Sequence, residues 1–203
     1  MNKYGLEVEF FGTKNGKLIN CSAFDIPHDE YPLLAEARGS AFACMFQAVA
    51  SVRGEIDRIT HLMLSKGIKP LFIDWQKKDS QLDEDILREG FHKRIAYRNL
   101  ANLEASPKNK DFISAGLHIS VTNTETAVFD TKRGRENFFY NRAIDFPYYF
   151  NRITKEFLPD IRKAERVENF YEVKPDGRVE YRSLPATIIH SKNFATRLAS
   201  CFN

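Results

Sequence analysis

Tyr4-Gly5-Leu6-Glu7-Val8-Glu9-Phe10-Phe11 is the stretch of sequence that decides the fold of this chain. Its apolar residues alternate with a period of two, so Leu6 and Val8 point to one face of a predicted strand. Glu7 and Glu9 then share the opposite face. The stretch therefore predicts a sheet that has one apolar face to bury and carboxylates on the other.

Three further segments carry acidic, histidine and arginine side chains: Glu36-Ala37-Arg38, Gly116-Leu117-His118 and Glu180-Tyr181-Arg182. Residues 112–121 also alternate, which puts His118 on the polar side of its strand, and Glu180 and Arg182 share a face by the same spacing. Carboxylates gathered on one surface repel each other unless a positive charge lies between them, and hard divalent cations prefer oxygen ligands. These segments predict a cation site on the polar face.

Length and composition limit the class of protein. The chain has 203 residues and a mass of 23.5 kDa, which fits a single domain over residues 1–203. A hydrophobic content of 43% excludes a disordered chain. The net charge of +3 comes from 30 basic and 27 acidic residues, a balance that gives no support for nucleic-acid or membrane binding.

Cysteine usage and the N-terminus indicate the compartment. Cys21, Cys44 and Cys201 are odd in number and contain no Cys-x-x-Cys pair, so neither a disulfide framework nor a zinc cluster is supported. The N-terminal residues lack the apolar core of a signal peptide, and residues 41–50 are too short to span a membrane. We expect a cytoplasmic protein.

Turn and cap signals divide the chain further. Asn15-Gly16 predicts a tight hairpin, because both residues tolerate positive φ. Ser40 is a predicted N-cap for a long amphipathic helix that runs to about Lys66, with Gly67 as its C-terminal signal. The apolar stripe of this helix, which includes Phe42 and Phe46, is interpreted as core covering the sheet. The other predicted elements are strands over 17–24, 33–38, 68–75, 112–121, 169–173 and 178–184, and helices over 82–104, 148–164 with a break at Pro159, and 188–202.

The residue types on the polar face limit the kinds of reaction that it could support. His118 alone is an ordinary polar-face histidine, but together with Glu7 and Glu180 it forms a plausible ligand set, since imidazole and carboxylates can share one ion. Arg182 would point at the same cations, and a guanidinium beside metal ligands fits an anion such as phosphate. The sequence has no P-loop, kinase motif set or Gly-x-Ser-x-Gly elbow. This combination favours phosphoryl transfer, and ATP, if it is used, would be held mainly through metals and arginines.

Read in order, the four segments around Glu7, Glu36, His118 and Glu180 resemble the phage-type amidoligases. These belong to the carboxylate-amine ligase superfamily, which includes glutamine synthetase and glutamate-cysteine ligase. The segment Arg178-Val179-Glu180-Tyr181-Arg182-Ser183-Leu184-Pro185 is the most specific part of the likeness. The resemblance implies an α+β fold, with a curved antiparallel sheet, helices packed on one face and a glutamine synthetase-like catalytic core.

The resemblance also implies metals and ATP on the concave face. Glu7, His118 and Glu180 would bind the Mg²⁺ or Mn²⁺ ion that engages the transferred phosphate. Glu9, with Glu36, would bind the metal beside the site of amine attack. The resemblance also implies that Glu36 is a catalytic residue.

The implied arginines would hold the nucleotide. Arg182 would stabilise the transferred phosphoryl group as a catalytic residue and contact ATP. Relatives carry a Gly-aromatic-Arg element between residues 160 and 177, and this chain has Arg162 and Arg166 there instead, either of which would take over that role. Ser120 stands where a second histidine is usual.

Three functions remain open from the sequence. The first is an ATP-dependent ligase that forms an amide through an acyl-phosphate, acting on a carboxylate and an amine that belong to a small molecule, peptide or protein, in a phage-infected cell. The second is a metal-dependent nuclease or phosphohydrolase, since clustered carboxylates also suit two-metal hydrolysis. The third is a non-catalytic, virion-associated binding protein on the same fold. The sequence leaves the assembly state open, a homo-oligomer included.

Overall fold

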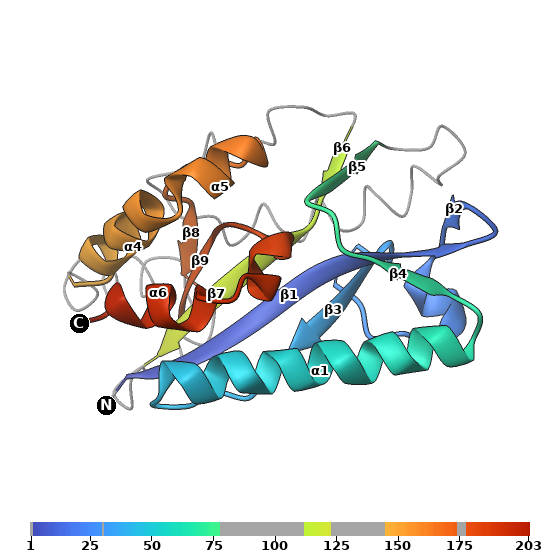
Figure 1. Ribbon diagram of the computed structural model, residues 1–203, viewed down its shortest axis with the longest axis horizontal. Helices are drawn as coiled ribbons and strands as arrows, with labels where there is room; N and C mark the ends of the chain where they lie inside the picture. The colour runs from blue at the N-terminus through green and yellow to red at the C-terminus, as the bar shows by residue number, and fades with distance from the viewer. Residues whose placement is uncertain (1, 30, 78–111, 123–144, 174–177) are drawn as a thin grey trace.

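The computed structural model describes residues 2–29, 31–77, 112–122, 145–173 and 178–203. The predicted helix over 82–104 and the turn at 174–177 lie outside the described residues. Figure 1 shows a mixed α and β molecule in which the long strand β1 (Lys3–Lys14) runs through the middle of the sheet. The predicted combination of helices with an antiparallel sheet is confirmed in the part of the chain that is described.

The main sheet is antiparallel in all its pairings. Its strand order is β2, β1, β7, β9, β8, and β3 and β4 also pair with β1. A separate two-stranded sheet joins β5 to β6. The strand bounds are β2 Lys17–Leu18, β3 Leu34–Arg38, β4 Lys69–Leu71, β5 Trp75–Lys77, β6 Phe112–Ser114, β7 Gly116–Thr122, β8 Tyr171–Val173 and β9 Val179–Pro185.

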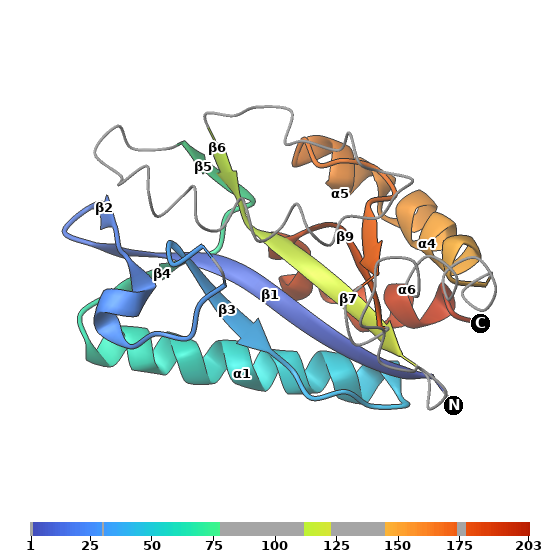
Figure 2. The ribbon, with the colours of Figure 1, turned by 180° about the vertical axis from the view of Figure 1, so that it is seen from behind.

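Helices cover the apolar face of this sheet. The described helices are α1 Met45–Ser65, α4 Asp145–Glu156, α5 Leu158–Lys163 and α6 Phe194–Ser200, with 3₁₀ turns η1 at Cys21–Phe24 and η3 at Ala186–His190. Figure 2, seen from behind, shows β7 and β9 in front of α6, with α1 running below β1. α4 packs against β9, where the rings of Phe150 and Tyr181 lie 5.2 Å apart. The predicted break at Pro159 is confirmed, because Pro159 lies in the first turn of α5.

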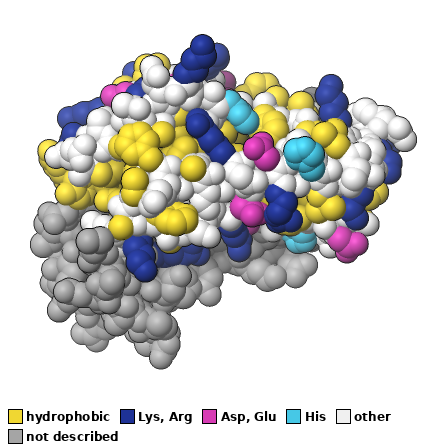
Figure 3. All heavy atoms as spheres, turned by 60° about the horizontal axis from the view of Figure 1, so that its bottom comes forward, with side chains coloured by type: hydrophobic (Ala, Val, Ile, Leu, Met, Phe, Trp, Pro, Cys, Tyr) yellow, Lys and Arg dark blue, Asp and Glu magenta, His cyan; other side chains and the backbone are white. Residues whose placement is uncertain are grey.

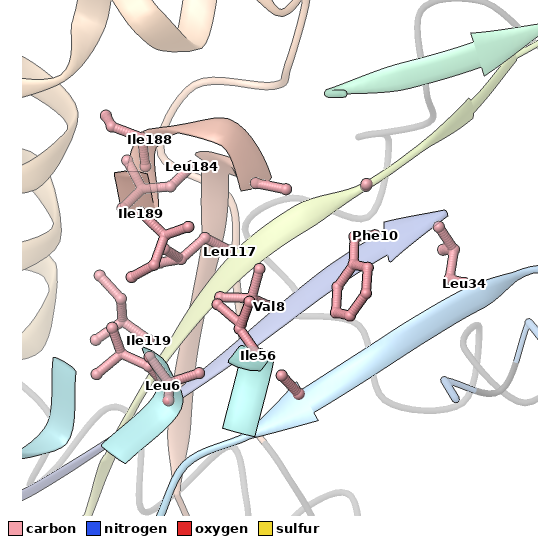
Figure 4. Close-up of a cluster of buried hydrophobic side chains, with 14 of the residues drawn as sticks. Leu6, Val8, Phe10, Leu34, Ile56, Leu117, Ile119, Leu184, Ile188 and Ile189 are labelled. Carbon is pink, nitrogen blue, oxygen red and sulfur yellow. The ribbon is translucent and has the colours of Figure 1, made fainter. Parts of the chain in front are cut away.

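The core lies between β1 and the elements that cover it. Figure 4 shows Leu6 of β1 beside Ile119 of β7, Val8 near Leu117 of β7 and Ile56 of α1, and Phe10 on the side of Leu34 of β3. Leu6, Val8 and Phe10 are all fully buried. The predicted apolar face of β1 is therefore the face that holds the core together.

The predicted start of the long helix is wrong. α1 begins at Met45 and not after Ser40, because Gly39 and Phe42 are bonded through the main chain to Leu6 and Tyr4 of β1. Tyr4 and Phe42 exchange two main-chain hydrogen bonds of 2.7 and 3.0 Å, and the Ser40 amide donates to Ser51 Oγ at 2.9 Å. Tertiary pairing to β1 thus outweighs the local capping signal of Ser40. The C-terminal signal is confirmed, since Gly67 has a φ of 69°.

Four predicted elements differ in extent. The hairpin at Asn15-Gly16 is confirmed, with both residues at positive φ, but its returning strand covers only Lys17–Leu18 before η1 begins. The predicted strand over 68–75 is divided into β4 and the start of β5, and the predicted strand over 112–121 is divided at Ala115, whose amide bonds to Asp74 O. The predicted helix over 188–202 is divided into η3 and α6, because Ser191 is extended and Arg53 binds the carbonyls of Ile189 and Ser191.

The outer side of α1 is solvent-facing. Figure 3 looks toward the bottom of Figure 1 and shows side chains of both charges interspersed with apolar ones. Phe46, which the sequence assigned to the buried stripe, is 52% exposed and lies on the first turn of the helix. No helix among the described residues is long and apolar enough to cross a membrane.

Candidate metal centre

The register of the sheet brings the predicted site residues into neighbouring rows. β1 pairs Glu7 with Arg38 of β3 on one side and with His118 of β7 on the other. One step further along, Glu9 pairs with Glu36, and Glu9 Oε2 accepts a 2.8 Å hydrogen bond from the Gly116 amide. The alternation of β1 therefore directs both glutamates to the same face as their neighbours on β3 and β7.

The first group consists of Glu7, His118 and Glu180. One ligand atom from each lies within 4.8 Å of the others. His118 Nδ1 is 3.9 Å from Glu7 Oε2 and 3.7 Å from Glu180 Oε1. Ligand atoms at ~2.1 Å from a common ion lie ~3 Å apart at right angles, so a modest contraction of this group would enclose a small divalent cation.

The second group consists of Glu9, Asp29 and Glu36, which also offer three oxygens within 4.8 Å of one another. Glu9 and Glu36 are directly opposite in the β1/β3 ladder and are 2% and 4% exposed. Like charges opposite each other in a sheet are destabilising, and burial makes the repulsion stronger. An all-carboxylate donor set of this kind suits Mg²⁺ or Mn²⁺.

The protonation of Glu36 reflects this crowding. Burial, followed by the charges of Glu7, Asp29 and Glu9, raises the pKa of Glu36 to about 8, and Arg38 opposes the shift. Without a cation, the folded protein therefore holds a proton on Glu36 at neutral pH. A divalent ion would release that proton on binding.

Arginines approach the two groups. Arg38 Nη2 lies 2.5 Å from Glu36 Oε2, and Arg178 Nη1 lies 3.3 Å from Glu7 Oε1. Arg182 Nη1 donates to Glu180 Oε1 from a position 9% exposed. The two groups together hold five carboxylates, and Arg38, Arg178 and Arg182 pair with three of them, Glu36, Glu7 and Glu180.

Gly116 permits the close packing around His118. A Cβ atom built on Gly116 would lie 2.9 Å from His118 Nε2 and 2.5 Å from Arg166 Nη2. Both distances are shorter than real Cβ contacts. His118 Nε2 lies 3.8 Å from Glu9 Oε1, so this one imidazole faces both carboxylate groups, with Nδ1 toward the first and Nε2 toward the second.

The two arginines expected to replace the missing motif occupy different positions. Arg162 lies on α5, where its side chain is 65% exposed and donates to Glu168 at 2.8 Å. Arg166 reaches the site and donates to the main-chain carbonyls of Ala115, Arg182 and Ser183. The structure thus brings Arg166 beside the acidic face and directs Arg162 to a surface ion pair.

Two residues of this site were missed from the sequence. Asp29 lies in an irregular segment, and the pairing of His28 with Ala35 and the bond from the Asp29 amide to Leu34 O bring it beside β3. Arg178 precedes β9 and contacts Glu7 from the other end of the chain. Ser120, at the place of the second histidine, donates to Glu180 Oε2 at 3.3 Å.

No family model matches the sequence, and no curated protein matches it. The geometry of the two carboxylate groups and the resemblance of the four short segments are therefore the features that bear on function.

Proposed function

We propose that this protein is an ATP-dependent carboxylate-amine ligase with a glutamine synthetase-like catalytic core, similar to the phage-type amidoligases. The observation that carries the proposal is the pair of buried carboxylate groups on one sheet face, joined by His118 and bordered by Arg182. Burying Glu9 opposite Glu36 costs stability, so we would not expect this pair on a sheet face that has only a structural role. Two adjacent cation sites with an arginine beside them suit the polyphosphate of a nucleotide.

The residues present fit Mg²⁺ or Mn²⁺, and such ions when bound would neutralise phosphate oxygens and lower the barrier to phosphoryl transfer. In this assignment Glu7, His118 and Glu180 would hold the first ion. Glu9, Asp29 and Glu36 would hold the second. Asp29 is added to the ligands that the sequence predicted, because its carboxylate is the third member of the second group.

In this proposal the arginines of the site bind the phosphate groups of ATP. Arg182 is paired to Glu180 and is almost buried, so it is held in place for a phosphoryl group rather than left in solvent. Burial and neighbouring carboxylates raise the pKa of Glu36 to about 8, so Glu36 holds a proton until a cation binds. Release of this proton would leave a carboxylate beside the site of amine attack. The reaction class is transfer of the γ-phosphoryl group of ATP to a carboxylate, followed by attack of an amine and release of phosphate.

Calorimetric titration of ATP, with and without Mg²⁺ or Mn²⁺, tests the nucleotide site. We expect metal-dependent binding by the wild type and its loss in a Glu7→Gln, Glu180→Gln double variant. Glu55→Gln is the matched control, because Glu55 lies on the outer side of α1 and pairs with Arg58. Equal binding by wild type and double variant, or no binding by either, would contradict the proposal.

Product analysis tests the reaction class. Incubation with ATP, Mg²⁺ and mixtures of carboxylates and amines should yield ADP and phosphate only when both substrates are present. AMP and pyrophosphate would indicate adenylation. Cleavage of a phosphodiester without ATP would indicate the nuclease that the clustered carboxylates also suit.

A further inference from the structure

The ladder between β7 and β9 contains an irregularity at the site. Leu117 pairs with Leu184 and Ile119 pairs with Tyr181, so two residues of β9 oppose the single residue His118 of β7. These two residues are Arg182 and Ser183. The arrangement is a β-bulge, which leaves main-chain groups of the longer strand outside the regular ladder.

The bulge changes which face the residues of β9 occupy. Tyr181 pairs with Ile119 and packs in the core, and regular alternation would then direct Leu184 to the acidic face. Leu184 is instead fully buried in the apolar cluster beside Leu117, Ile188 and Ile189 (Figure 4). The extra residue therefore lets one strand supply Glu180 and Arg182 to the acidic face and Leu184 to the core.

Arg166 holds the carbonyl groups of this bulge. Its Nη2 donates to Arg182 O at 2.7 Å, and its Nε donates to Ser183 O at 3.2 Å. Its Nη1 donates to Ala115 O at 3.0 Å, immediately before β7 begins. One planar guanidinium thus connects the bulge of β9 to the start of β7, which a lysine with a single ammonium cannot do with the same geometry.

The bulge is also held from its other side. The Phe170 amide donates to Ser183 Oγ at 2.7 Å, and the Arg182 amide donates to Phe170 O at 2.8 Å. The segment that leads from α5 into β8 therefore carries both Arg166 and Phe170 to the bulge. The main chain at Arg182 and Ser183 is fixed on several sides, although the bulge interrupts the ladder.

We propose that Arg166 is a positioning residue of the metal centre. Its guanidinium fixes the bulge of β9 against the start of β7 and so determines where Glu180 and Arg182 lie relative to His118. This inference rests on the proposed function. It differs from the nucleotide contact that the resemblance implied for Arg166, because it requires Arg166 for metal binding even when no nucleotide is present. Partners that orient metal ligands typically change metal affinity by about 10- to 100-fold when removed.

Titration of Mn²⁺ alone, followed by the electron paramagnetic resonance signal of the free ion, provides the first test. Arg166→Lys and Arg166→Gln should weaken Mn²⁺ binding by about tenfold or more. Arg53→Lys is the matched control, because Arg53 also donates to main-chain carbonyls, those of Ile189 and Ser191 after the end of β9. Arg53→Lys should keep the wild-type Mn²⁺ affinity even if it lowers the melting temperature as much as Arg166→Lys does.

A measurement on the metal-free protein separates this inference from the proposed function. The imidazole NMR signals of His118, assigned with a His118→Gln variant, should shift in Arg166→Lys and stay unchanged in Arg53→Lys. If the wild type binds no Mn²⁺, the proposed function fails, and the His118 signals alone decide whether Arg166 positions this ring. Ser183→Ala, which removes the bond to the Phe170 amide, provides a milder variant if the Arg166 variants do not fold, and it should shift the same signals.

Two results would overturn the inference. Unchanged Mn²⁺ affinity in Arg166→Lys together with weaker binding of Mg²⁺-ATP would make Arg166 a nucleotide contact. Unchanged His118 signals in both Arg166→Lys and Ser183→Ala would show that the bulge does not set the position of the ring. Partial recovery of Mn²⁺ affinity in an Arg166→Ala variant on addition of methylguanidinium would support the inference, since a purely global loss of stability would not be reversed in this way.

Discussion

Val8 and Glu9 are neighbours on β1 and are almost equally buried, at 0% and 2% exposure, yet they affect folding in opposite directions. Val8 lies in the apolar cluster under the sheet, where burial stabilises the fold. Glu9 lies opposite Glu36 and near Asp29, where burying ionised carboxylates together is unfavourable and raises the pKa of Glu36 to about 8. One face of β1 thus stabilises the fold, and the other face buries acidic side chains at a cost in stability.

The largest expected effect comes from the apolar face. Phe10 is fully buried and stacks on Phe72 at 4.6 Å between ring centroids, so Phe10→Ala should lower the free energy of unfolding by about 3–5 kcal/mol. Urea denaturation measures this change. A loss below about 1 kcal/mol would mean that the apolar face of β1 does not hold the core.

Gly116→Ala should disturb the acidic face with a smaller loss of stability. The new methyl group would meet Arg166 and His118, and overpacking of this kind costs about 1–3 kcal/mol. Mn²⁺ binding should fall much more than stability does, because His118 must move. Gly54→Ala is the control, since nothing lies within 4 Å of a Cβ there and alanine favours the helix. Normal Mn²⁺ affinity in Gly116→Ala would contradict the described packing of His118.

The pH dependence of stability sharpens the contrast between the faces. Because the pKa of Glu36 rises from 4.5 to about 8 on folding, the folded protein binds more protons than the unfolded chain between these values. The stability that this group contributes is therefore complete below about pH 4.5 and is lost as the pH rises toward 8, with a slope of at most ~1.4 kcal/mol per pH unit. Glu36→Gln should flatten that slope in metal-free melts. A wild-type stability that increases across the same interval would contradict the protonation of Glu36.

The smallest expected effect is that of Arg38→Gln. Arg38 is 62% exposed and pairs with Glu36 at the rim of the second group, so its removal should change stability by less than about 1 kcal/mol. Its loss takes away a favourable charge, and the pKa of Glu36 should rise further. Thermal melts and a pH titration of Mn²⁺ binding measure both effects. If Arg38→Gln lost more stability than Gly116→Ala does, the exposed Arg38 would matter more to the fold than the buried packing around Gly116, which would contradict this prediction.

The sequence predicted those parts of the fold that depend on local signals. The alternation of β1 placed Glu7 and Glu9 on one face, and the hairpin at Asn15-Gly16 and the end of α1 near Gly67 follow from residues that tolerate positive φ. The predicted start of α1 was wrong because Gly39 and Phe42 bond to β1, a contact that no local pattern reports.

The site was predictable where its residues lie in regular strands. Periodicity identified His118, Glu180 and Arg182, but it carried no information about Asp29, which reaches the second group from an irregular segment. The bulge opposite His118 was also hidden, since it is visible only in the register of β7 against β9. Arg166 could be named from the sequence, whereas its bonds to three carbonyls depend on that bulge.

The most direct test of the central claim is anomalous diffraction from crystals grown with Mn²⁺. We expect two Mn²⁺ peaks, one among Glu7, His118 and Glu180 and one among Glu9, Asp29 and Glu36, with the ligand atoms of each group closer together than the present 4.8 Å limit. The absence of both peaks at millimolar Mn²⁺, with the arginines still paired to the carboxylates, would contradict that claim.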